Sequence, residues 1–199
     1  MSSTIRLATE ADAEAIQAIY APYVRVTAIS FELEPPDVAE MRTRISKTLA
    51  LFPWLVCENS EGQVVGYAYA SRHRDRAAYQ WSVDAAVYVD LRTHRTGVGR
   101  GLYTSLFALL RLQGFYNVYA GIALPNEASV GLHKAVGFQP VGVYHGVGYK
   151  LGKWHDVSWW SLTLQPSAVE PAAPRPITEI SGSPAGQSAL DAGLPLIHS

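Results

Sequence analysis

Hydrophobic residues recur along the chain at two spacings, one typical of helices and one typical of strands. Thr9 and Asp12 form a T-x-x-D capping pattern, which marks the start of a helix. A second helix is predicted to begin at Asp37, with Glu40 as its capping partner. The apolar residues that follow the first cap repeat at helical spacing: Ala15, Ile16, Ile19, Tyr20 and Tyr23.

Strand patterns lie between the helices and after them. The segments "WLVCEN" (54–59) and "VVGYAYASR" (64–72) flank a polar turn, which predicts a hairpin. The segment "AYQWSVDAAVYVD" (78–90) predicts the next strand. Residues 102–114 predict a helix that Gly114 ends, and a shorter helix ends at Gly137. Three further strands are predicted within 115–124, 138–151 and 156–164. The mixture indicates an α/β (α+β) protein.

The composition changes after residue 165. From Gln165 onward Pro, Ala, Gly and Ser predominate, with isolated apolar residues between them. Such a segment buries little apolar surface to offset the entropy lost on ordering, so we expect it to be mobile or to lie along another surface. The sequence therefore predicts a domain at 1–165 and a C-terminal tail at 166–199.

Composition and charge exclude several classes of protein. The 199 residues are 48% hydrophobic and 17% charged, as in ordinary globular proteins. The net charge is −1 without a basic block, so we expect no nucleic-acid partner. No basic-then-apolar start and no span of about 18 apolar residues is present, so we expect a cytoplasmic protein without a membrane partner. Cys57, the single cysteine, is either a catalytic thiol or a buried strand residue.

A glycine-rich turn precedes the helix predicted at 102–114. Gly97, Gly99 and Gly101 alternate with other residues. A turn of this kind at a helix start exposes backbone N–H groups that suit a phosphate or pyrophosphate. The spacing fits neither the dinucleotide fingerprint G-x-G-x-x-G nor a P-loop. From the glycines alone, a plain turn without a ligand remains the alternative.

The residues around the turn resemble those of one enzyme family. The segments "VYVDLRTHRTGVGRGLYTSL" and "LPNEASVGLHKAVGF" are similar to the acetyl-coenzyme A binding segment of the GCN5-related N-acetyltransferase (GNAT) superfamily. Within it, "ISFELEP", "PWLVCE", "RAAYQW" and "WHDV" resemble phosphinothricin acetyltransferases. The resemblance covers about Thr4 to Leu164. It implies the GNAT fold, a central mixed β-sheet that is splayed near its middle and has helices on both faces.

The resemblance also implies how acetyl-coenzyme A (acetyl-CoA), the co-substrate, is held. One strand would pair with the pantetheine, the glycine turn would bind the pyrophosphate, and the next crossover would add polar contacts. The superfamily has Gln or Arg where His94 stands, so only backbone donors are expected there. His94 has no partner at metal-ligand spacing, and we expect no metal. The implied cofactor-binding residues are Val87, Tyr88, Val89, Arg95, Thr96, Gly97, Val98, Gly99, Arg100, Asn126 and Ser129.

Two residues are candidates for proton transfer. The resembling enzymes have Glu at the position of Asp84, so this carboxylate is one methylene shorter. Asp84 either relays the proton of the acceptor amine, directly or through water, or forms a structural hydrogen bond. His133 lies where the resembling enzymes have a histidine that serves the leaving thiolate. Its alternative is a core histidine that hydrogen-bonds a backbone carbonyl.

The segment "SRHRDRAAYQW" carries the expected acceptor specificity. Arg72, Arg74 and Arg76 alternate at a predicted strand end and would share one face. Arginine binds carboxylate or phosphinate through a bidentate fork, although a charged strand end can also be plain solvated surface. The resemblance assigns Arg74 and Arg76 to substrate anions, with Phe31 and Tyr79 as pocket walls. Trp154, His155 and Asp156 are interpreted as a structural or dimer-forming hairpin corner.

Together these patterns predict an N-acetyltransferase that acts by direct attack in a ternary complex. The acceptor would be the α-amine of a small amino-acid-like molecule of the phosphinothricin, methionine sulfoximine or methionine sulfone type. The alternatives are acetylation of a peptide or protein N-terminus and a binding module that senses acetyl-CoA without turnover. The resemblance also implies a homodimer.

Overall fold

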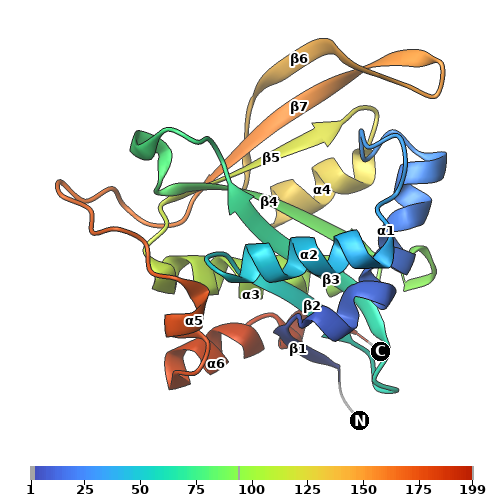
Figure 1. Cartoon of the computed structure of the whole chain (residues 1–199). Coiled ribbons are helices and arrows are strands. Elements are labelled where there is room, and N and C mark those ends of the chain that lie inside the picture. The colour runs from blue at the N-terminus through green and yellow to red at the C-terminus, as the bar shows by residue number, and fades with distance from the viewer. Residues whose placement is uncertain (1–2, 94, 199) are drawn as a thin grey trace.

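One mixed sheet of seven strands forms the centre of the protein (Figure 1). The computed structural model describes residues 3–93 and 95–198. Strand order across the sheet is β1-β2-β3-β4-β5-β7-β6. Neighbouring strands are antiparallel except β4 and β5, which are parallel, so the predicted mixed sheet is confirmed. The strands are β1 (Thr4–Leu7), β2 (Trp54–Glu58), β3 (Val64–Arg72), β4 (Ser82–Val89), β5 (Asn117–Ala123), β6 (Gln139–Lys150) and β7 (Lys153–Thr163).

Helices cover both faces of the sheet, as the sequence predicted. Helices α1 (Ala13–Val26) and α2 (Val38–Leu49) bury their apolar sides against one face. Helices α3 (Val98–Gln113) and α4 (Glu127–Ala135) pack on the other. The predicted caps are confirmed: Asp12 accepts hydrogen bonds from the backbone N–H and the hydroxyl of Thr9, and Asp37 accepts one from the N–H of Glu40. These local hydrogen bonds fix the residues at which α1 and α2 begin.

The sheet splays between its two parallel strands. Their pairing includes only Ser82 with Asn117, Val83 with Val118, and Asp84 with Tyr119. Beyond Asp84 the two strands separate, while β4 stays paired with β3 up to Val89. The open side of β4 and the matching side of β5 therefore form a fork, and Asp84 lies at its apex.

Two details of the predicted strands were wrong. The strand predicted at 78–90 begins only at Ser82, because the chain forms a turn of 3-10 helix at Ala77–Tyr79. Strand β3 ends before this turn, at Arg72. The alternation predicted to align Arg74 and Arg76 with Arg72 on one face needs an extended chain, and the backbone is not in a strand at either residue. The reason is the short connection, which must reverse the chain between two antiparallel strands.

The residues after 165 pack against helix α3. They form α5 (Ile177–Ile180) and α6 (Pro184–Asp191), whose apolar side chains join the core on the α3 face. Ser105 in α3 donates a hydrogen bond to the carbonyl of Leu190 at 2.7 Å. We expected this segment either to be mobile or to lie along another surface, and the structure shows the second. The division of the chain at residue 165 stays a prediction.

Candidate functional site

A cleft of about 620 Å³ opens where β4 and β5 separate. Its lining comes from β4, the start of α3, the start of α4 and the end of α1. All eleven residues that the sequence assigned to the cofactor belong to it. The lining residues are Tyr23, Ile29, Val87, Tyr88, Val89, Thr93, Arg95, Thr96, Gly97, Val98, Gly99, Arg100, Asn126, Ala128, Ser129 and Leu132.

The glycine turn gives the cleft a helix N-terminus. Gly97 precedes α3 with φ of 80°, a left-handed conformation that glycine adopts without strain. The N–H of Gly101 bonds to the carbonyl of Gly97, so it begins the helical ladder. The N–H groups of Val98, Gly99 and Arg100 come before that bond and have no acceptor within the helix. They form a partial positive charge at the cleft, which suits a pyrophosphate.

A second helix start lies across the cleft. Asn126 precedes α4, and its side-chain oxygen accepts a hydrogen bond of 3.1 Å from the N–H of Ser129. The amide of Asn126 is thus fixed as a helix cap at the cleft. Sequence reasoning missed Tyr23, whose hydroxyl donates to the carbonyl of Val89 at 2.6 Å. Its only signal was its place in the apolar repeat of α1.

The end of the chain contacts the glycine turn from outside the cleft lining. The N–H of His198 donates a hydrogen bond of 2.8 Å to the carbonyl of Thr96. The side chain of Ile197 packs on the same core as α3. The glycine turn that lines the cleft is therefore contacted by residues of the predicted tail as well as by residues of the predicted domain.

Asp84 is a partly shielded carboxylate at the apex of the fork. Its side chain is 31% exposed. Burial raises the pKa of Asp84 above its ordinary value, and the hydrogen bond from His73 and the positive charge of Arg74 offset part of that effect. A carboxyl group with these surroundings can hold or pass a proton. Its catalytic role stays a prediction.

His133 lies beneath the cleft and is 4% exposed. Its Nδ1 lies 2.8 Å from the carbonyl oxygen of Ser129, and its Nε2 lies 3.1 Å from the hydroxyl of Tyr103. The neutral ring therefore donates to the carbonyl and accepts from the tyrosine. Burial lowers the pKa of His133, which keeps it neutral. These contacts favour the alternative of a satisfied core histidine, and its service to the thiolate stays a prediction.

The residues assigned to the acceptor are spread over two parts of the molecule. Arg74, Arg76 and Tyr79 are exposed in the connection between β3 and β4. Arg74 donates to the carbonyl of His73 and lies over the ring of Trp159 at 6.0 Å. Phe31 lies in the connection between α1 and α2, where its ring covers Gly148 so closely that a side chain on that glycine would overlap it. Both groups are exposed enough to contact a small molecule.

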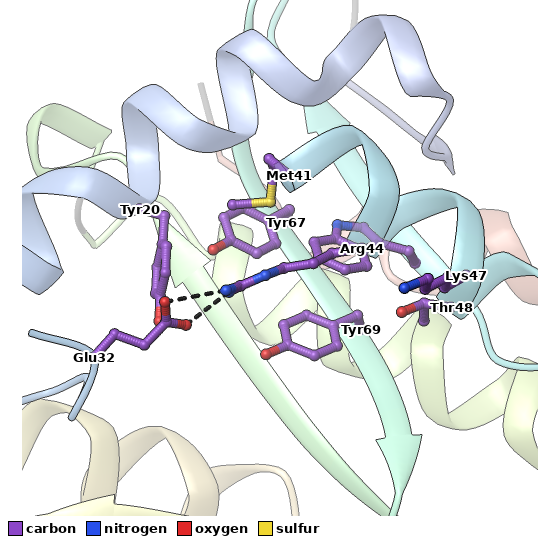
Figure 2. Close-up of a pocket in the computed structure, with 9 residues that line it drawn as sticks. Tyr20, Glu32, Met41, Arg44, Lys47, Thr48, Tyr67 and Tyr69 are labelled. Carbon is purple, nitrogen blue, oxygen red and sulfur yellow. Dashed lines mark hydrogen bonds and ion pairs between the residues drawn. The ribbon is translucent and has the colours of Figure 1, made fainter. Parts of the chain in front are cut away.

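A second cavity, of about 270 Å³, lies beside the connection between α1 and α2 that carries Phe31 (Figure 2). Figure 2 shows Arg44 reaching across it to Glu32, with Tyr67 and Tyr69 on either side of the arginine and Tyr20 beside the carboxylate. Arg44 Nη1 lies 2.7 Å from the carboxylate of Glu32, and the hydroxyl of Tyr20 donates to the same carboxylate at 2.9 Å. The ion pair and the hydrogen bond join α2 and α1 to the loop that carries Phe31.

Lys150 holds the same connection from the other side. Its buried ammonium donates to the carbonyls of Val24 and Ser30 at 2.7 and 2.6 Å. It therefore joins β6 to the end of α1 and to the loop that follows. The loop around Phe31 is therefore anchored from both sides.

Within 3–93 and 95–198, no group of three or more His, Cys, Asp and Glu side chains is placed to hold a metal ion. No helix in that same part of the chain is long and apolar enough to span a membrane. Cys57 is buried in β2, and burial raises the pKa of its thiol to about 11.

Comparison with known proteins agrees with this geometry. The profile of the Acetyltransferase (GNAT) domain matches residues 5–159. The phosphinothricin N-acetyltransferase of Streptomyces viridochromogenes is 40% identical over 177 residues, which cover 89% of this chain and 94% of that protein. An L-methionine sulfoximine/L-methionine sulfone acetyltransferase of Pseudomonas paraeruginosa is 33% identical over 172 residues, which cover 86% of this chain and all of that protein.

A solved structure shows the same fold. The phosphinothricin acetyltransferase from Sinorhizobium meliloti, crystallised with acetyl-CoA, superimposes with a TM-score of 0.82 and is 33% identical. The match covers 86% of this chain and 94% of that one. The splayed sheet, the helix start at the cleft and these sequence matches lead to one conclusion: the chain belongs to the GNAT acetyltransferase family.

Proposed function

We propose that the protein transfers the acetyl group of acetyl-CoA to the α-amine of a small amino-acid-like acceptor. Phosphinothricin, methionine sulfoximine and methionine sulfone represent the acceptor class. The observation that carries the proposal is the fork between β4 and β5, with the α3 N-terminus on its open side and Asp84 at its apex. The named activities of the relatives supply the acceptor class.

Acetyl-CoA fits the cleft on chemical grounds. The N–H groups at the start of α3 suit the pyrophosphate, and the edge of β4 at Val87, which has no neighbouring strand on the β5 side among the described residues, suits the amides of the pantetheine. Asn126 and Ser129 add polar groups on the far side. When bound, acetyl-CoA supplies a thioester that is reactive toward amines. The protein's own residues orient the acceptor and handle its protons, with Asp84 on the side of the amine.

The acceptor would be held by its negative groups. Arg76 makes no side-chain hydrogen bond with any residue that the structure describes, so its guanidinium is free for a carboxylate or phosphinate. Arg74, fixed above Trp159, can supply a second positive charge. Phe31 and Tyr79 add apolar walls. This charge favours a small anionic acceptor over a peptide N-terminus, for which an acidic groove would be the better match.

An acceptor screen tests the proposal. Released thiol is measured at saturating acetyl-CoA with phosphinothricin, methionine sulfoximine, methionine sulfone, ordinary amino acids and short peptides. We expect the highest kcat/KM among the first three. Higher kcat/KM on peptides would establish the N-terminal acetyltransferase alternative, and acetyl-CoA binding without turnover would establish the binding module.

We also propose that the protein works as a cytoplasmic homodimer without nucleic-acid or membrane partners. The hairpin of β6 and β7 leaves an apolar surface exposed, which supports burial against a second copy. The net charge of −1 gives no attraction for nucleic acid. We call this surface the hairpin face; it consists of Val141, Val143, Val147, Tyr149, Leu151 and Trp154.

A further inference from the structure

A histidine outside the predicted site contacts the carboxylate at the apex of the fork. His73 Nδ1 lies 2.7 Å from Asp84 Oδ1. His73 follows the end of β3 by one residue, and Ser71 pairs with Asp84 across the two strands. The His73 side chain is 12% exposed, against 31% for Asp84. Both groups are therefore shielded from bulk water, which strengthens the interaction between them.

Aromatic contacts fix the plane of the His73 ring. It stacks on Tyr119, with ring centres 4.4 Å apart and planes 19° from parallel. Tyr119 is the β5 residue that pairs with Asp84, so the histidine lies directly at the point where the two strands separate. Tyr79 contacts the ring edge-on at 6.0 Å. The histidine is thus held by both arms of the fork and by the turn before β4.

The hydrogen bond also selects the tautomer of His73. An ionised carboxylate accepts hydrogen bonds and donates none, so Nδ1 carries the hydrogen of the neutral ring. The lone pair is then on Nε2, which has no hydrogen-bond partner among the described residues. His133 differs in this respect, because the Ser129 carbonyl and the Tyr103 hydroxyl occupy both of its nitrogens. Of these two histidines, only His73 has a ring nitrogen without a hydrogen-bond partner among the described residues.

We propose that Nε2 of His73 accepts the proton of the acceptor amine, with Asp84 as the positioning residue behind it. The inference rests on the proposed function, because it concerns an amine acceptor. It also accounts for the shorter carboxylate, because the imidazole held by Asp84 supplies the proton-accepting atom in place of a longer acidic side chain. Asp84 fixes the tautomer and stabilises the imidazolium that forms.

The proton balance of the step is complete without another reactant. The acceptor ammonium passes one proton to Nε2, which later releases it to water. The neutral amine nitrogen then bonds to the acetyl carbon, and the bond between that carbon and sulfur breaks. The second nitrogen proton goes to the sulfur of the departing thiolate. The products are the N-acetylated acceptor, the free thiol and one proton.

Several charged or titratable groups surround the pair and bear on its pH dependence. Arg74 lies in the same connection and favours the ionised form of Asp84. Tyr69 in β3 interacts electrostatically with Asp84. Tyr79 and Tyr119 face the ring from the turn and from β5. Of these groups, Asp84 and Arg74 carry the charges that act on His73, in opposite directions.

Nuclear magnetic resonance of the full chain with ¹⁵N-labelled histidine tests the geometry without substrate. We expect the neutral His73 ring to carry its hydrogen on Nδ1, and Asp84→Asn to weaken this preference. Signals are assigned by their loss in His73→Gln. A neutral ring with the hydrogen on Nε2 would overturn the proposal, because that nitrogen would have no lone pair for the amine proton.

Kinetics test the proton transfer, using the amine that the wild-type protein acetylates fastest. His73→Phe keeps a ring to stack on Tyr119 but removes the base. We expect kcat to fall by about 10² or more while the Kd for acetyl-CoA, measured by calorimetry, stays unchanged. We expect the acidic limb of the pH profile of kcat/KM to be lost, and added imidazole to restore part of the rate to His73→Ala.

A matched control exists in the exposed pair of His145 and Asp156, whose side chains meet at 2.9 Å. His145→Phe should leave the acidic limb and kcat in place. Wild-type kcat in His73→Phe would show that His73 only packs, and would overturn the inference while leaving the proposed function intact. Failure of the proposed function is seen separately, as a wild-type protein that acetylates no amino-acid-like acceptor.

Discussion

Gly97 and Leu196 are in contact although 98 residues of chain separate them. A Cβ atom built on Gly97 would overlap the carbonyl oxygen of Leu196. Gly97 also has φ of 80°, in the region that favours glycine. The turn that begins α3 is therefore shaped on one side for a phosphate and closed on the other by the end of the chain.

We predict that Gly97→Ala weakens acetyl-CoA binding about tenfold or more, through backbone strain and through the clash with Leu196. Calorimetry measures the Kd. Gly62→Ala is the matched control, because Gly62 has φ of 77° and nothing within 4 Å of its Cβ position. Removing residues 193–199 should make Gly97→Ala less harmful, because the clashing carbonyl is gone. Strictly additive effects of the two changes would show that the contact is irrelevant to the loop.

Gly99 gives a separate test of cofactor binding by the backbone. Its Cβ position is 3.2 Å from Leu132 and 3.6 Å from Val89, both of which line the cleft. Gly99→Val should fill this side of the cleft and raise the Kd for acetyl-CoA by an order of magnitude or more, in a folded protein. Gly131→Val is the matched control, because it makes the same change in helix propensity in α4 and has open space around its Cβ position. Equal Kd values for the two variants would contradict backbone binding at α3.

Arg76 should select acceptors by their negative groups. Arg76→Ala removes the proposed bidentate contact and should raise KM for methionine sulfone about ten- to a hundredfold, or roughly 1.5–3 kcal/mol. An uncharged arylalkylamine should be affected far less. Arg72→Ala, at the end of β3, is the control for loss of a nearby charge. An equal loss of kcat/KM on both acceptors would assign Arg76 to the fold instead of the substrate.

His133 should make stability depend on pH. Because burial lowers its pKa in the folded protein, the unfolded chain binds more protons between that value and about 6.5. Its contribution is therefore fully present above about pH 6.5 and declines as the pH falls through the folded-state pKa. The free energy of unfolding in urea is measured for wild type and for His133→Gln. The difference between the two should shrink by up to about 1.4 kcal/mol for each pH unit that the pH falls within that window. A difference independent of pH would show that His133 does not titrate with folding.

The hairpin face should control the oligomeric state. Replacing Tyr149 and Trp154 by Asp places two charges in a surface that a dimer would bury, and the dimer should dissociate. Light scattering after size exclusion measures the mass. Val169→Asp, which changes a fully exposed residue far from the hairpin, is the control. A wild-type mass of about 21.7 kDa would refute the dimer.

The sequence by itself determined the features that depend on local pattern. The caps at Thr9 and Asp37, the hairpin of β2 and β3 and the glycine start of α3 follow from residue preferences within a few positions. The ordered set of short matches determined the family, and with it the splay and the cofactor cleft. Local hydrogen bonding and periodicity suffice for the caps, the hairpin and the glycine start, because each of these is formed by neighbours in the chain.

Only the tertiary structure decided the contacts between distant segments. The pairing of His73 with Asp84, the two partners that occupy His133, and the docking of Leu196 on Gly97 each join residues whose spacing carries no periodic signal. Because its own apolar residues are few, the sequence left two alternatives for the tail: that it is mobile, or that it lies along another surface. It is ordered because Ile177, Ile180 and Leu190 add to a core that α3 has already formed, so that each buries its surface against existing apolar neighbours.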